Sequence, residues 1–133
     1  MGVSGMAIIV TAEDNADIRK LAARSLRRAG HTVVETADGR EALDAVRAHR
    51  PDAVVTDVDM PRMTGLELSA AIRADPDLKH TPVLVVSGSI ELHDVRAAEA
   101  GVTAVLGKPY APPELLQHLD ELLAHPSRHG HGS

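Results

Sequence analysis

The chain alternates between short apolar runs and longer segments in which apolar residues recur every three or four positions. The short runs are rich in β-branched residues, which predicts buried strands at residues 6–11, 31–36, 53–57, 82–87 and 104–106. Each run is followed by a segment with helical periodicity. The pattern therefore predicts a strand followed by a helix, five times over.

Capping residues and chain breakers set the expected helix boundaries. Asn15 can cap a first helix that ends at Gly30, in which apolar residues recur at helical spacing: Ile18, Leu21, Ala22, Leu26 and Ala29. Asp38-Gly39 predicts a turn before a second helix, which Pro51 ends. Further helices are expected at 65–74 and 90–100, and a last one begins near Pro113.

This alternation predicts an α/β fold. Parallel strands joined by right-handed helical crossovers form a doubly wound sheet with helices on both faces. The 133 residues fit a single domain, which we expect over residues 6–124. Residues 1–5 and the Gly- and His-rich residues 125–133 are expected to be a disordered N-terminus and a disordered tail.

Composition narrows the classes of function. The formal net charge is −5 with both signs interspersed, which argues against a nucleic-acid partner. Cysteine is absent, so disulfides and thiolate metal sites are excluded. There is no signal peptide pattern and no apolar run of membrane-spanning length, so we expect a cytoplasmic protein that does not bind membranes.

Polar side chains follow four of the five predicted strands. Glu13 and Asp14 follow the first strand, Asp57 ends the third, Ser87 ends the fourth and Lys108 follows the fifth. Because the carboxyl ends of parallel strands share one edge of the sheet, we expect these groups to form one pocket.

The chemistry of this group favours a magnesium-assisted phosphoryl acceptor. Clustered carboxylates repel one another, and oxygen ligands without His or Cys suit Mg²⁺. With the metal screening its charge, Asp57 can attack a phosphoryl group to form an aspartyl phosphate. Ser87 and Lys108 would then bind the phosphoryl oxygens.

Four stretches in this order, IIVTAEDNADIR, VVTDVDMPRMTG, VLVVSGS and AVLGKPY, resemble the signatures of response-regulator receiver domains, the phosphoacceptor modules of two-component signalling. The resemblance covers about residues 6–124. It implies a flavodoxin-like (βα)₅ fold with strand order 2-1-3-4-5. It also implies phosphorelay signalling in which a histidine kinase or histidine phosphotransfer protein is the donor and phosphorylation changes binding to an unknown downstream protein. The chain would not be an enzyme beyond its own phosphorylation and dephosphorylation.

The resemblance also assigns roles to single residues. It implies that Asp57 is the phosphoacceptor, and that Asp14, Asp57 and the backbone carbonyl of Asp59 bind Mg²⁺. Glu13 would act through metal-bound water, Ser87 would be the hydroxyl that moves toward the phosphate, and Lys108 would pair with the phosphate. The Lys108-Pro109 peptide bond is expected to be cis.

Two alternatives remain open. Asp57-Val58-Asp59 also matches the nucleophile motif of haloacid-dehalogenase-type phosphatases, although those enzymes supply their metal-binding acids after the lysine rather than before the nucleophile. The other is an interaction module that keeps the fold without phosphorylation. Val105 stands where receivers usually carry the Tyr or Phe that responds to phosphorylation, so this chain has no comparable ring at that position to report the movement of the hydroxyl.

Overall fold

The computed structural model describes residues 7–88 and 94–124. Its five strands are β1 (Ile8–Ala12), β2 (Thr32–Thr36), β3 (Ala53–Asp57), β4 (Val83–Ser87) and β5 (Ala104–Gly107). They form one parallel sheet in the order β2-β1-β3-β4-β5, as the resemblance predicted. The alternating helices are α1 (Ala16–Arg28), α2 (Gly39–His49), α3 (Gly65–Ala74), α4 (Val95–Glu99) and α5 (Pro112–Ala124).

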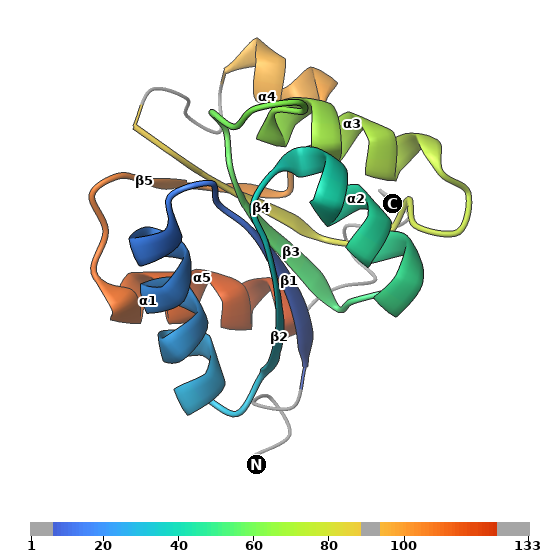
Figure 1. Ribbon diagram of the computed structural model, residues 1–133. Coiled ribbons are helices and arrows are strands. Elements are labelled where there is room, and N and C mark those ends of the chain that lie inside the picture. The colour runs from blue at the N-terminus through green and yellow to red at the C-terminus, as the bar shows by residue number, and fades with distance from the viewer. Residues whose placement is uncertain (1–6, 89–93, 125–133) are drawn as a thin grey trace.

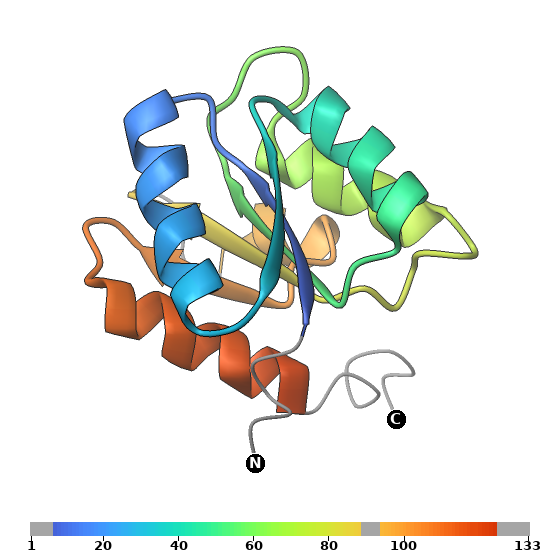
Figure 2. The same ribbon diagram turned by 60° about the horizontal axis from the view of Figure 1, so that its bottom comes forward.

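The helices cover both faces of the sheet (Figures 1 and 2). Helices α1 and α5 pack on one face through Leu26, Leu115 and Leu119, which are fully buried. Helices α2, α3 and α4 pack on the other face, where Val46, Leu68 and Ala97 are fully buried. This arrangement confirms the doubly wound sheet.

Local capping explains where several helices begin. The Asn15 side chain accepts a hydrogen bond from the backbone N–H of Ile18 at 3.0 Å, as expected for the start of α1. Thr64 and Glu67 form a reciprocal capping box at the start of α3. The Asp38-Gly39 turn prediction was wrong in detail, because Asp38 is the N-cap of α2 and Gly39 is its first helical residue.

The sheet covers only part of the apolar side of α1. Leu26 is fully buried, but the side chains of Ile18 and Leu21 are 39% and 61% exposed. Helical periodicity shows which residues share a side of a helix, but it does not show which part of that side the sheet covers. These two residues instead form part of an exposed apolar surface beside α5.

Three expectations fall partly or wholly outside the described residues. They are the disorder of residues 1–5, the disorder of residues 125–133 and the first part of the predicted helix 90–100. Within the described part of that last segment, α4 spans Val95–Glu99. None of the helices in the described ranges has the length and apolar character needed to cross a bilayer.

Candidate phosphoacceptor and metal site

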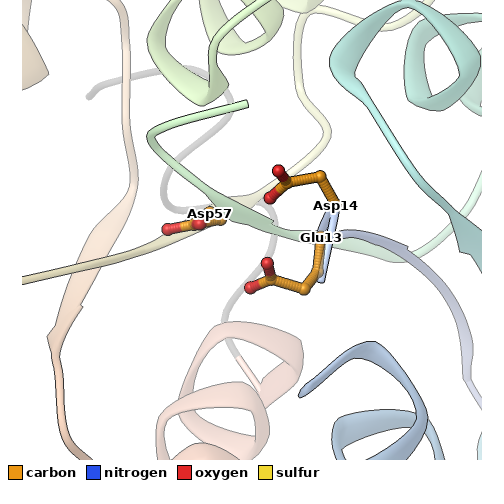
Figure 3. Close-up of side chains that lie close together, drawn as sticks. All are labelled: Glu13, Asp14 and Asp57. Atoms are coloured by element: carbon orange, nitrogen blue, oxygen red, sulfur yellow. The ribbon is translucent and has the colours of Figure 1, made fainter. Parts of the chain in front are cut away.

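Three carboxylates meet at the carboxyl edge of the sheet. Glu13 and Asp14 follow the last residue of β1, and Asp57 is the last residue of the neighbouring strand β3. One carboxylate oxygen from each of the three side chains lies within 4.8 Å of the others. Figure 3 shows the three side chains reaching toward the same side from the two strands. The structure therefore brings together the three acids that the sequence pattern placed in one pocket.

Asp57 is held in place at this edge. Its side chain is buried, and its Oδ1 accepts a hydrogen bond from the backbone N–H of Val58 at 2.9 Å. The following backbone is fixed as well, because the carbonyl of Val58 accepts the N–H of Gly65 at 2.9 Å. A carboxylate at the end of a buried strand, tied to its own loop, has little freedom to turn away from an incoming group.

Lys108 supplies the positive charge. Its Nζ lies 3.1 Å from Oδ1 of Asp57 and 3.8 Å from Oε1 of Glu13. Partial burial alone would lower the pKa of Lys108, but the hydrogen bond and charge of Asp57 and the charge of Glu13 outweigh it and raise that pKa. The ammonium group is therefore charged at neutral pH. The Lys108-Pro109 peptide bond is cis, as expected.

Ser87 and Asp59 complete the set of predicted site residues. Ser87 is the last residue of β4 and is buried, and its carbonyl accepts the backbone N–H of Lys108 at 2.9 Å. The Asp59 side chain is exposed, and its carboxylate does not belong to the three-acid group. This position is compatible with the expected contribution of Asp59 through its backbone carbonyl alone.

The surroundings of Glu13 raise the pKa of its carboxyl group. Burial raises its pKa, and the charge of Asp57 adds to the effect, although the N–H of Asn15 and the charge of Lys108 partly oppose it. The donor set fits a hard divalent cation, because it offers clustered carboxylate oxygens without sulfur or imidazole. A bound Mg²⁺ would screen the repulsion among the three carboxylates and oppose the rise in the pKa of Glu13.

Replacing Glu13 by glutamine is expected to stabilise the metal-free protein at neutral pH. A carboxyl group whose pKa is raised by folding favours the folded state at acidic pH and loses that contribution as the pH rises through its folded-state pKa. The neutral amide avoids the cost of keeping a charged carboxylate in this site. The free energy of unfolding should therefore rise by an amount on the order of 0.5–1 kcal/mol, a small value because the site is partly open to solvent. Urea denaturation at pH 5 and pH 7.5 measures the difference, which should be larger at the higher pH. Glu121→Gln, at an exposed position on α5, is the matched control, and an equal gain in this control would contradict the explanation.

Two neighbouring residues were missed as parts of the site. Tyr110 follows the Lys-Pro pair and lines a cavity together with Asp57 and Lys108. Its pKa is raised mainly by burial and, to a smaller extent, by the charge of Glu13. Thr11 lines the same cavity from β1. The sequence signal was their closeness to Lys108 and Glu13. Val105, at the usual aromatic position, is partly buried against the core on the α2, α3 and α4 face.

Comparisons with known proteins agree with this geometry. Residues 9–120 match the family described as response regulator receiver domain. The response regulator MprA of Mycolicibacterium vanbaalenii is 40% identical over 116 residues, which cover 86% of this chain. The chain spans about half of that relative, since the match covers 49% of MprA.

Solved structures show the same fold. The chemotaxis response regulator CheY4 of Vibrio cholerae superimposes with a TM-score of 0.84 at 35% identity, over 89% of this chain and 99% of that one. The receiver domain of the sensor histidine kinase PA1611 from Pseudomonas aeruginosa, with magnesium coordinated in its active-site cleft, gives a TM-score of 0.81 at 26% identity, over 89% and 98% of the two chains.

The family match covers most of the chain and includes every acid of the cluster as well as Lys108. Because the site and the fold both agree with the receiver family, the match favours this family over the haloacid-dehalogenase-type alternative. The chain therefore belongs to the response regulator receiver domain family of two-component signalling systems.

Proposed function

We propose that this protein accepts a phosphoryl group on Asp57 in a phosphorelay. The observation that carries the proposal is the placement of Lys108 Nζ 3.1 Å from Oδ1 of Asp57, beside a group of three carboxylates at the carboxyl edge of the sheet. An isolated surface aspartate needs no such surroundings. A nucleophilic carboxylate needs a cation to bind the oxygens of the incoming phosphoryl group.

The transfer follows from this arrangement. A carboxylate oxygen of Asp57 attacks phosphorus, a new O–P bond forms, and the bond from phosphorus to the donor's leaving group breaks. For a phosphohistidine donor the leaving group is the imidazole nitrogen, which takes up a proton. Lys108 and the hydroxyl of Ser87 would bind the phosphoryl oxygens. Attack by water on the aspartyl phosphate would later release inorganic phosphate and restore the carboxylate.

Asp14, Asp57 and the backbone carbonyl of Asp59 would hold Mg²⁺, with Glu13 acting through a metal-bound water. The bound metal would supply positive charge that offsets the repulsion between the carboxylates and the phosphoryl oxygens. The chain's own part is to hold the acids together at the strand ends and to place Lys108 against them. The magnesium in the PA1611 receiver supports this assignment by family likeness.

Incubation with acetyl phosphate tests the proposal. With Mg²⁺ present, we expect the intact mass to rise by one phosphoryl group, about 80 Da. With the metal chelated, no adduct is expected. Absence of the adduct in both conditions would contradict the proposal and favour a module that acts without phosphorylation. Sustained turnover of p-nitrophenyl phosphate would contradict it in another way, because it would indicate a phosphatase.

An apolar groove beside the site is the proposed docking surface for the phosphohistidine-bearing segment of the donor protein. The groove has a volume of about 580 Å³ and lies between α1 and the start of α5, with Ile18, Leu21, Tyr110, Pro112 and Leu115 among its lining residues. Lys108 also lines it, so the groove opens next to Asp57. A protein that delivers a phosphoryl group to Asp57 would cover this surface.

The exposed side of α1 indicates what kind of partner fits. Arg19 and Arg27 pair with Glu35, whereas Lys20, Arg24 and Arg28 form no ion pair with any residue in the described ranges. These three cations line a separate hollow together with Arg27 and Glu35, on another side of α1 from the groove. They therefore favour long-range attraction to an acidic donor rather than contacts inside the groove. The transfer rate from the protein donor should therefore fall as ionic strength rises.

Leu21→Glu is expected to slow phosphotransfer from a protein donor about tenfold or more, because it places a charge in the apolar groove. Labelling by acetyl phosphate should stay unchanged, since a small donor needs no docking surface. The measurement compares both donors, using a purified histidine kinase that labels the wild-type protein. Val95→Glu is the matched control, because Val95 is similarly exposed on α4, on the other face of the sheet. An equal loss in the control variant, or no loss in Leu21→Glu, would contradict the docking proposal.

A further inference from the structure

Thr11 presents an unexplained polar group beneath the acidic site. It lies on β1 and is 3% exposed, and its Oγ1 has no hydrogen-bond partner among the described residues. Two other buried threonines differ in this respect. The hydroxyl of Thr36 donates to the carbonyl of Thr11 at 2.7 Å, and that of Thr56 donates to the carbonyl of Asp57 at 2.9 Å. A buried hydroxyl without a partner destabilises the folded state, so a partner is expected.

Strand geometry places the Thr11 side chain under the carboxylates. Thr11 lies in β1 and Glu13 directly follows the strand, where its N–H still donates to the carbonyl of Thr36 at 3.1 Å. The alternation of the strand therefore places the Thr11 and Glu13 side chains on the same face, and both line the same cavity. Thr11 also pairs with Val55, which is two residues before Asp57 on β3. On the face of the sheet that α1 covers, the Thr11 side chain is therefore the neighbour of the Glu13 and Asp57 carboxylates on the side away from the carboxyl edge.

A small cavity lies at this position. It has a volume of about 20 Å³ and is lined by Thr11, Glu13, Asp57, Lys108 and Tyr110, with apolar contributions from Val55 and Ala22. A single water molecule needs about 10–15 Å³ on this measure and two to four polar partners. The cavity offers enough volume, and the lining side chains carry hydroxyl, carboxylate and ammonium groups.

We propose that this cavity binds one structural water molecule, which bridges the Thr11 hydroxyl to the carboxylate of Glu13 or Asp57. Thr11 is then a positioning residue, because it acts on the acidic site through the water and does not touch the metal or the phosphoryl group. Hydrogen bonds to a metal-binding carboxylate from the side away from the metal orient it and affect metal affinity. This functional part of the inference rests on the proposed function, whereas the water site itself does not.

A crystal structure of the metal-free protein at a resolution that defines ordered waters tests the site directly. We expect a water within about 2.7–3.2 Å of Thr11 Oγ1 and of a carboxylate oxygen of Glu13 or Asp57. The inference is overturned if the cavity holds no water, or if the hydroxyl bonds to a protein group instead. Neither outcome depends on phosphorylation, so the water site and the proposed function fail independently.

Two variants separate a role in positioning from simple packing. Thr11→Val keeps the shape but removes the hydroxyl, and is expected to lose the water, lower the thermal midpoint and weaken Mg²⁺ binding by roughly 3- to 10-fold in calorimetric titration. An unchanged or raised midpoint would indicate a dry cavity and overturn the inference. Thr11→Ser keeps the hydroxyl and should retain the water and near wild-type Mg²⁺ affinity. Equal weakening of Mg²⁺ binding in both variants would show a packing effect and overturn the positioning role.

Discussion

Replacing Lys108 by alanine is expected to slow phosphorylation by acetyl phosphate by about 10²- to 10³-fold, the loss typical of removing one group that stabilises developing charge. The reason is geometric, because Nζ of Lys108 lies 3.1 Å from Oδ1 of Asp57. Among the described residues, it is the cation nearest to the three clustered acids. Without this cation, the carboxylates and the incoming phosphoryl oxygens repel one another with less compensation. Time courses of intact mass at fixed Mg²⁺ measure the rate.

Lys79→Ala is the matched control for this experiment. Lys79 is exposed and lies after α3, away from the carboxyl edge of the sheet. Its removal changes the net charge by the same amount but leaves the site unchanged. A Lys108→Ala rate within about twofold of the Lys79→Ala rate would contradict the role given to Lys108.

Replacing Gly65 by alanine is expected to damage both folding and phosphorylation. A Cβ atom at Gly65 would overlap the backbone carbonyl oxygen of Asp57, so either the start of α3 or the end of β3 has to move. Forcing extra atoms into a packed site costs about 1–3 kcal/mol. The displaced backbone is that of the phosphoacceptor itself, so the labelling rate should fall together with the free energy of unfolding.

Gly107→Ala provides the control for the Gly65 variant. A Cβ atom at Gly107, in β5, would meet no atom of another residue within 4 Å, and no positive φ is recorded there. Its free energy of unfolding should stay within about 0.5 kcal/mol of the wild type. Urea denaturation and acetyl phosphate labelling of both variants check the prediction, and equal effects at the two positions would contradict it.

The strands and most of the site were predictable from the sequence because their signals are local. A β-branched run that ends in an acid followed closely by a proline defined β3 and its last residue, Asp57. The acids after β1 and the lysine after β5 reach Asp57 because parallel strands align their carboxyl ends. The topology alone was enough to bring these residues together.

The remaining features depend on contacts that a one-dimensional pattern does not contain. Ile18 and Leu21 have the spacing of buried residues, yet they line an exposed groove because α5 does not cover them. Gly39 reads as a turn residue, but it begins α2, where a Cβ atom would overlap the backbone of Met63. The orphan hydroxyl of Thr11 depends on the exact shape of the cavity below Glu13.

The central claim is that Asp57 accepts the phosphoryl group. The most direct measurement is the intact mass of wild type, Asp57→Asn and Asp59→Asn after the same incubation with acetyl phosphate and Mg²⁺. The account predicts a gain of about 80 Da in the wild type and in Asp59→Asn, whose altered side chain is exposed and outside the carboxylate group, and no gain in Asp57→Asn. The same gain in Asp57→Asn, or no gain in the wild type, would contradict the account.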